Sequence, residues 1–143
     1  MGSRAVRVPI WVVAALASSG ATGVSACSSY PCTTEGYSST IVVEVEGRRS
    51  DIADLELCVE DRCSSDDDVT DPSRLIAHGP PTRADDGSRW TFGVALHRDH
   101  LVVRALAADG SILRETPVSV DFRRVGGSAR CGGPQEAIVR IDV

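Results

Sequence analysis

Short runs of alternating or β-branched apolar residues recur along most of the chain. Residues 40–46 are β-branched and end in alternation, while residues 54–60 and 89–96 alternate apolar and polar side chains. A period of two is typical of a strand with one face toward a core. The same pattern predicts further strands at residues 75–77, 101–107, 111–116, 118–122 and 136–143.

No window of the chain has a convincing helical period, so we expect strands without intervening helices. Such strands pair antiparallel and form a sandwich or a barrel. Asp109-Gly110 lies between two of the predicted strands and indicates a hairpin turn. We therefore predict an all-β fold, an antiparallel β-sandwich of about seven strands. Trp90 and Phe92 are expected to fill its interior.

The alternation within residues 54–60 predicts which of its side chains face the core. The core-facing residues are Leu55, Leu57 and Val59. The opposite and more exposed face carries Glu56, Cys58 and Glu60. A disulfide made by Cys58 is therefore expected on the outside of this strand.

The first 26 residues follow a different pattern. Arg4 and Arg7 precede an apolar run at residues 8–17, and small residues follow up to Ala26. A helix needs roughly 20 apolar residues to cross a bilayer, so this run is too short. A basic start, a short apolar centre and a small-residue end are typical of a secretory signal peptide. We expect residues 1–26 to be that signal.

The junction Val24-Ser25-Ala26-Cys27 resembles the lipobox of bacterial lipoproteins. That resemblance implies that Cys27 becomes the acylated N-terminus of a protein anchored outside the cell membrane. Two or more acyl chains hold a protein on a bilayer durably. Val-Ser-Ala also suits ordinary signal peptidase, so free secretion is an alternative, and an uncleaved anchor is a third.

The number of cysteines supports acylation. The chain has five, and an odd count is awkward in an oxidising compartment. Without Cys27, four remain, and these allow three connectivities. The sequence does not settle which of the three forms. Cys58 and Cys63 flank four residues, a spacing that favours their pairing across a hairpin with a four-residue loop, and this pairing would leave Cys32 with Cys131. A zinc site would need a second closely spaced pair or histidines beside this one, which the sequence does not offer.

We expect three parts: the lipoprotein signal (1–26), a lipidated N-terminus with a short tether (27–38) and a β-sandwich domain (39–143). Removing residues 1–26 leaves 117 of 143 residues, and taking away Arg4 and Arg7 moves the net charge from −5 to −7. That length suits one hydrophobic core. The negative charge argues against a nucleic-acid partner and against adsorption to anionic headgroups.

Several of these features together resemble small actinobacterial lipoproteins of unknown function with an immunoglobulin-like or transthyretin-like sandwich. They are the lipobox, the Cys58–Cys63 hairpin, the Asp109-Gly110 turn, and Cys131 in a Gly/Pro-rich loop before a β-branched strand. The resemblance spans most of the chain. It implies a fold and a location but no activity, because such sandwiches host many functions.

The candidate chemistry is sparse. Hard carboxylate oxygens suit calcium, and the candidate ligands are Asp66, Asp67, Asp68 and Asp71. The run is consecutive and lacks the glycine of a calcium loop, so a solvated acidic loop is the better interpretation. His97 and His100 are expected at a turn, and no motif marks a nucleophilic serine. We expect no cofactor and no metal.

The function predicted from the sequence is a non-enzymatic binding or envelope-structural module held on the membrane by its lipid. A calcium-dependent interaction module and a small extracellular hydrolase are the alternatives. Residues 64–87, rich in Asp and Pro, are expected to form a long surface loop. Long loops on rigid scaffolds often carry recognition, so the contact surface is predicted there.

Overall fold

The computed structural model describes residue 32 and residues 36–67, 70–95 and 97–143, all within the compact unit Cys32–Val143. The predicted signal peptide and Cys27 lie outside these residues.

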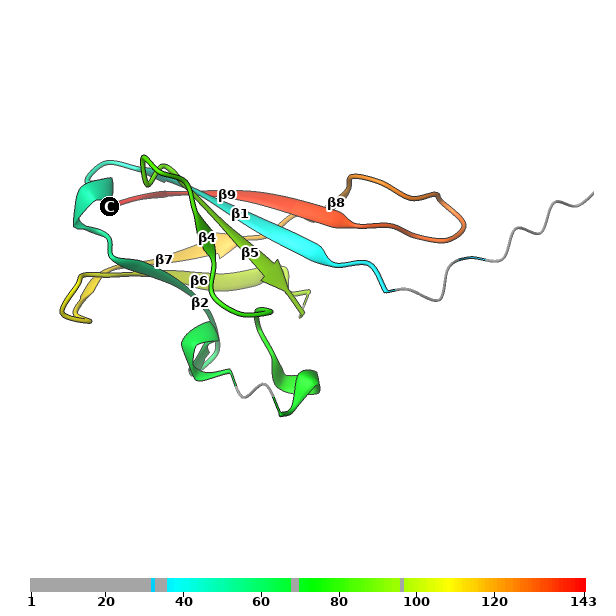
Figure 1. Cartoon of the computed structure of the whole chain (residues 1–143), viewed down its shortest axis with the longest axis horizontal. Coiled ribbons are helices and arrows are strands. Elements are labelled where there is room, and N and C mark those ends of the chain that lie inside the picture. The colour runs from blue at the N-terminus through cyan, green and yellow to red at the C-terminus, as the bar shows by residue number, and fades with distance from the viewer. Residues whose placement is uncertain (1–31, 33–35, 68–69, 96) are drawn as a thin grey trace, which may run out of the picture. The chain divides into compact units, whose positions relative to one another are not determined.

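Nine strands in the described residues form two sheets (Figure 1). The first sheet has the order β4-β5-β1-β9-β8, and the second has the order β3-β2-β6-β7. The first sheet comprises β1 Ser39–Glu46, β4 Thr82–Arg83, β5 Arg89–Val94, β8 Arg123–Arg124 and β9 Gln135–Asp142. The second comprises β2 Asp54–Val59, β3 Arg62–Cys63, β6 His100–Leu106 and β7 Ile112–Ser119. Three short 3₁₀ helices lie between strands: η1 Arg49–Asp51, η2 Ser64–Asp66 and η3 Pro72–Arg74.

The predicted fold class is confirmed, since the chain forms an all-β sandwich. One pairing differs from the antiparallel expectation: β1 and β9 run parallel, with Ser39 opposite Gln135 and Glu46 opposite Asp142. The chain leaves the first sheet after β1 for β2 and β3, returns for β4 and β5, crosses again for β6 and β7, and returns for β8 and β9. Both strands can therefore enter the first sheet from the same end.

Two predicted strands merge into one. Residues 111–116 and 118–122 were expected as separate strands, but β7 runs continuously through Pro117. Proline lacks the N–H that a ladder needs, so it is tolerated at a sheet edge. β7 is such an edge strand, because only β6 pairs with it. The strand expected at residues 75–77 is reduced to a single bridge between Ala77 and Val94.

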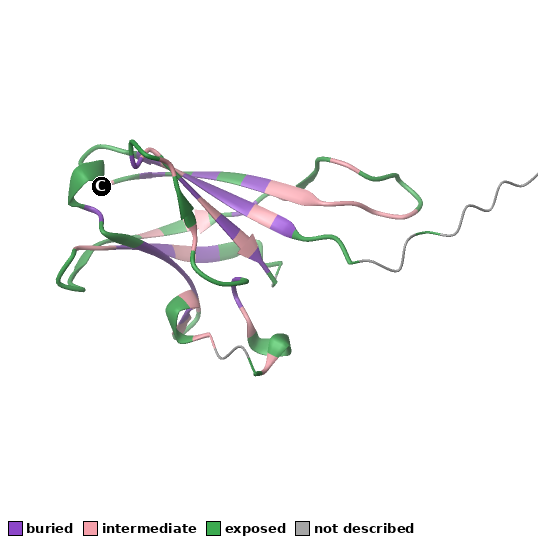
Figure 2. Cartoon of the chain, in the orientation of Figure 1, coloured by how far each residue is buried: buried purple, intermediate pink, exposed green. Residues whose placement is uncertain are grey.

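The core lies between the sheets and follows the predicted alternation (Figure 2). Trp90 and Phe92 are both buried, as expected. The first sheet contributes Ile41, Val43, Val45, Trp90, Phe92, Val94, Ala137, Val139 and Ile141. The second contributes Leu55, Leu57, Leu101, Val103 and Ala105. Burial of these apolar side chains is the main favourable term holding the sheets together.

The outer face of β2 is less exposed than the alternation predicts, although Glu60 at its end is exposed. Glu56 is only 9% exposed and Cys58 only 4%. Cys58 lies opposite Val102 of β6, so its sulfur is covered from that side and by its disulfide partner. The Glu56 carboxylate lies 3.6 Å from the guanidinium of Arg104, on the neighbouring strand. Cross-strand neighbours therefore cover a face that alternation alone marks as solvent-facing.

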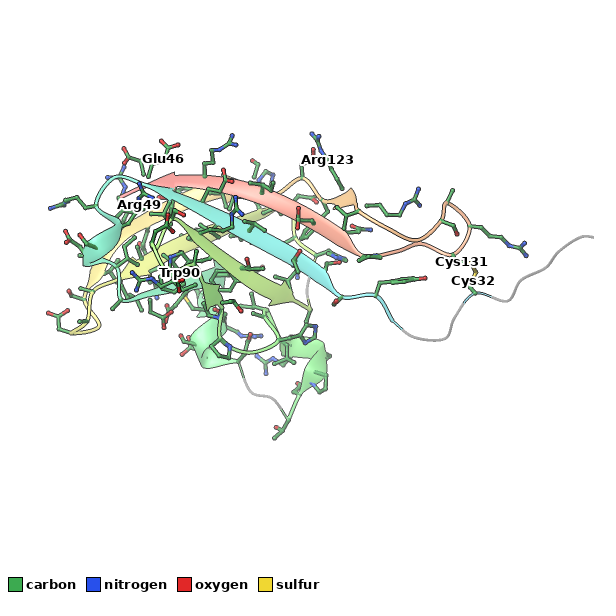
Figure 3. The ribbon with its side chains drawn as sticks, turned by 45° about the horizontal axis from the view of Figure 1, so that its top comes forward. Cys32, Glu46, Arg49, Trp90, Arg123 and Cys131 are labelled. Carbon is green, nitrogen blue, oxygen red and sulfur yellow. A yellow bond between two sulfur atoms is a disulfide. The ribbon has the colours of Figure 1, made fainter. Side chains whose placement is uncertain are left out.

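Both predicted disulfides are present. Cys58 and Cys63 are cross-strand partners, and Val59 pairs with Arg62. The connection is therefore a two-residue turn rather than a four-residue loop. The second bridge joins Cys32 to Cys131 and spans 99 positions of sequence (Figure 3). It attaches the chain before β1 to the loop between β8 and β9.

Candidate binding surfaces

The loop predicted as a contact surface is folded around one carboxylate, that of Asp67. Its Oδ2 accepts the backbone N–H groups of Ile76 at 2.8 Å and Ala77 at 2.9 Å. Its Oδ1 lies 3.2 Å from the guanidinium of Arg62, which also donates to the carbonyl of Arg74. The Asp67 side chain is 6% exposed. Two distant parts of the loop are therefore held together at one buried anion.

A cleft of about 270 Å³ separates this loop from β2. Its apolar wall includes Ala77, Pro80 and Pro81, and the acidic side chains on it are those of Asp54, Glu56 and Asp67. Ligand pockets for small molecules usually measure roughly 300–1,000 Å³, so this cleft lies just below that range. Its size suits one side chain or a short segment of a partner.

The described candidate calcium ligands, Asp66, Asp67 and Asp71, do not form a cluster of ligand atoms. Asp71 accepts the amide N–H and the hydroxyl of Ser73, at 3.2 and 2.6 Å, and so caps η3. Asp66 accepts the Cys63 N–H at 3.4 Å, and Asp67 is bonded as described above. Asp68 lies outside the described residues. Each described carboxylate of the run serves a different part of the backbone.

Another grouping of metal-ligand residue types lies on the second sheet. Among the described residues, Glu56, Cys58 and Cys63 are the set whose ligand atoms come close together. Zinc and related metals bind the cysteine thiolate. Both sulfurs are committed to the disulfide, so this set is not a metal site while the bridge is closed.

The histidines expected at a turn each lie against a serine, but only His97 lies in the loop between β5 and β6, because His100 is the first residue of β6. His97 Nε2 is 2.7 Å from Ser39 Oγ, and its ring packs edge-on against Phe122 at 4.6 Å between centroids. His100 Nδ1 is 3.3 Å from Ser119 Oγ. Sequence reasoning missed both pairs, because 58 and 19 positions separate their members.

These pairs lack features that a nucleophilic serine requires. A serine nucleophile needs a base that a third group orients. Among the described residues, no carboxylate is hydrogen-bonded to either imidazole. Ser39 is also only 3% exposed, so a substrate has little access to its hydroxyl. The His97–Ser39 pair joins the loop between β5 and β6 to β1, and the His100–Ser119 pair is a cross-strand contact between β6 and β7.

A second surface lies on the outer face of the second sheet. A shallow groove of about 400 Å³ has a floor that includes Cys58, Val102 and Pro117, with Glu60 and His100 at its side. Glu60 has a φ of 56°, in the left-handed region that glycine normally occupies. The strand pattern gave no signal for this groove, because its floor combines three strands.

None of the described residues belongs to a helix that is long and apolar enough to cross a membrane. No family model, no curated protein and no solved structure matches this chain.

Proposed function

We propose that the protein is a lipoprotein, anchored through Cys27 on the outer side of the cell membrane, whose β-sandwich serves in binding rather than catalysis. The observation that carries this proposal is the pairing of the cysteines. Cys32 bonds Cys131 and Cys58 bonds Cys63, so the fifth cysteine has no cysteine partner left in the chain. Acylation gives that thiol a chemical role.

The disulfides also support the location. Structural disulfides persist in oxidising compartments and are rare in the cytosol. Two bridges in a domain of this size therefore favour export. The segment before Cys27, with its basic start and short apolar run, supplies the export signal that this location requires.

A binding role is supported by the cleft beside β2. Its wall combines apolar contact area with hydrogen-bonding groups, and Asp67 holds the loop that forms one side. A pre-organised loop loses less conformational entropy when a partner binds. We propose that Pro80 and Pro81, which line the cleft just before β4, contact an envelope protein.

The anchor is tested by mass spectrometry of the mature protein and by detergent partitioning. The wild type should carry acyl chains on residue 27 and enter the detergent phase, and Cys27→Ala should remain aqueous. Cys32→Ala/Cys131→Ala is the matched control, since it removes two cysteines but keeps Cys27. An unmodified residue 27, or equal partitioning of wild type and Cys27→Ala, would show the anchor to be wrong.

The contact surface is tested by site-specific photo-crosslinking in intact cells. A photoreactive residue in place of Pro80 should give a discrete adduct with an envelope protein. The same residue in place of Ile112, which is 54% exposed and lies on β7, should not. Identical adducts from both positions, or none from Pro80, would remove the cleft as the contact surface.

A further inference from the structure

Positive charge gathers at the hairpin formed by β8 and β9. Residues 122–135 contain Arg123, Arg124 and Arg130 and no carboxylate, in a chain whose net charge is −5. Two acids flank this segment, Asp121 and Glu136, and Glu136 is the cross-strand partner of Arg123, so Arg124 and Arg130 at the far end carry most of the uncompensated charge. Arg124 donates to the carbonyl of Ser128 at 2.9 Å. Arg130 makes no ion pair with any described residue, and Arg123 makes a single one, at 3.4 Å, in which both side chains are about 81% exposed. Water screens such a pair strongly.

Exposed apolar side chains accompany these arginines. Val125 is 61% exposed and Tyr37 is 45% exposed. Tyr37 lies between Cys32, which is bonded to this hairpin, and Ser39, which is paired with Gln135 of β9. Tyr37, Arg123, Arg124, Val125 and Arg130 are together called the hairpin-end surface.

The hairpin holds a defined shape. Ser128 N–H bonds the carbonyl of Gly132 at 2.8 Å, and the disulfide fixes Cys131 to Cys32. Gly127 has a φ of +72°, and a Cβ there would lie 2.0 Å from the Gly132 carbonyl oxygen. The two arms therefore approach more closely than any residue but glycine permits. The arginines are presented on an ordered loop that does not have to fold on contact.

The same disulfide and the length of the chain limit how far this surface can lie from the proposed anchor. Cys27 precedes Cys32 by five positions, which reach at most about 17 Å when fully extended. An acylated Cys27 therefore keeps the hairpin within a short distance of the headgroups. Basic residues contribute about 1 kcal/mol each at an anionic bilayer, within a Debye length of roughly 8–10 Å.

We propose that the hairpin-end surface rests on anionic lipid, with its arginines at the headgroups and Val125 and Tyr37 at the interface. Tyrosine favours that interface because its ring is apolar and its hydroxyl is polar. The inference builds on the proposed anchor, which supplies proximity. The net negative charge of the chain is an average and does not describe this end of the domain. Lipid contact would orient the sandwich on the membrane.

The test uses the mature protein as processed by the cell, which lacks Trp11 of the proposed signal peptide, with one tryptophan introduced as a depth probe. Val125→Trp is compared with Ile112→Trp, an exposed position that follows the Asp109-Gly110 turn. Trp90 is buried and gives a constant background. The vesicles contain equal amounts of brominated phosphatidylglycerol and phosphatidylcholine, or brominated phosphatidylcholine alone. We expect quenching in Val125→Trp on the anionic vesicles only, and none in Ile112→Trp.

The charge requirement is measured in the Cys27→Ala background, where no acyl chain contributes. Arg124→Gln/Arg130→Gln should lower partitioning into the anionic vesicles roughly 25-fold, which is about fivefold for each arginine. Arg48→Gln/Arg114→Gln is the matched control and should change it little. Both of these arginines are exposed, and neither belongs to the hairpin.

The outcomes separate the two proposals. An unacylated Cys27 together with arginine-dependent partitioning would overturn the anchor and support the lipid-facing surface. An acylated Cys27 with equal partitioning of both arginine pairs, or with no quenching of Val125→Trp, would overturn the surface and support the anchor alone. In that case the hairpin-end surface would be left for a protein partner.

Discussion

Replacing Asp67 with alanine should loosen the long loop and destabilise the whole domain. The substitution removes the acceptor for two amide groups, at 2.8 and 2.9 Å, and one ion-pair partner. A hydrogen bond to a charged group contributes about 1.5–3 kcal/mol, and a buried amide left without a partner carries its full desolvation cost. The two amides belong to Ile76 and Ala77, both buried.

The size of the effect depends on what can replace the carboxylate. Asp67 also lines the cleft, so water entering from there can partly satisfy the amides. The side chain of Arg62 is 36% exposed, so its ion pair contributes at most about 1 kcal/mol. We therefore expect Asp67→Ala to lower the free energy of unfolding by about 3 kcal/mol, near the lower end of the range for a buried ion pair that loses one partner.

Urea unfolding with the disulfides intact measures this loss. If the free energy of unfolding falls by about 1.5 kcal/mol for each molar of urea, the urea concentration at the midpoint of unfolding should fall by about 2 M. Asp67→Asn keeps one acceptor oxygen and should lie between wild type and Asp67→Ala. Asp66→Ala is the matched control and should cost less than about 1 kcal/mol, because its carboxylate makes one long bond, at 3.4 Å.

Hydrogen exchange gives the local test. In Asp67→Ala the amides of Ile76 and Ala77 should exchange much faster, while those of β6 should change only with global stability. The reasoning is refuted if Asp67→Ala has the same midpoint as Asp66→Ala. It is also refuted if the two amides keep their wild-type protection.

Three further predictions concern metal, the long disulfide and pH. Calcium and chelator should give the same melting temperature, because the described carboxylates of residues 66–71 bond the protein itself; a rise with calcium would contradict this. Cys32→Ala/Cys131→Ala should lower the free energy of unfolding by up to about 5 kcal/mol, since the bridge closes 99 positions; unchanged urea midpoints would count against it. Hydrogen bonds from the hydroxyl and the amide of Ser111 lower the pKa of Asp109 from its ordinary value of 3.8. The ionised Asp109 carboxylate therefore stabilises the fold above pH 3.8, and this stabilisation is lost as the pH falls through the lower pKa of the folded state. Asp109→Asn should therefore be less stable than wild type near neutral pH and equal to it in strong acid, which thermal melting across pH 6 to about 2 checks.

Local pattern was sufficient for the fold class and for the Cys58–Cys63 disulfide, whereas the Cys32–Cys131 disulfide followed by elimination. Alternation shows which residues can line one face of a strand, so it identified Trp90 and Phe92 as core residues. The spacing of Cys58 and Cys63 indicated a hairpin bridge because geometry over a few residues is set by the backbone itself. Each of these properties depends on neighbours in the sequence, and the sequence contains them in full.

The tertiary structure decided what distant segments do to one another. The parallel pairing of β1 with β9 and the burial of Glu56 depend on which strands become neighbours in a sheet. In the run of acids, Asp67 differs from Asp66 because only the Asp67 carboxylate accepts hydrogen bonds from two backbone amides nine and ten positions away. The contacts between serine and histidine arise in the same way. Such contacts follow from packing the whole chain around one core, and no local pattern specifies them.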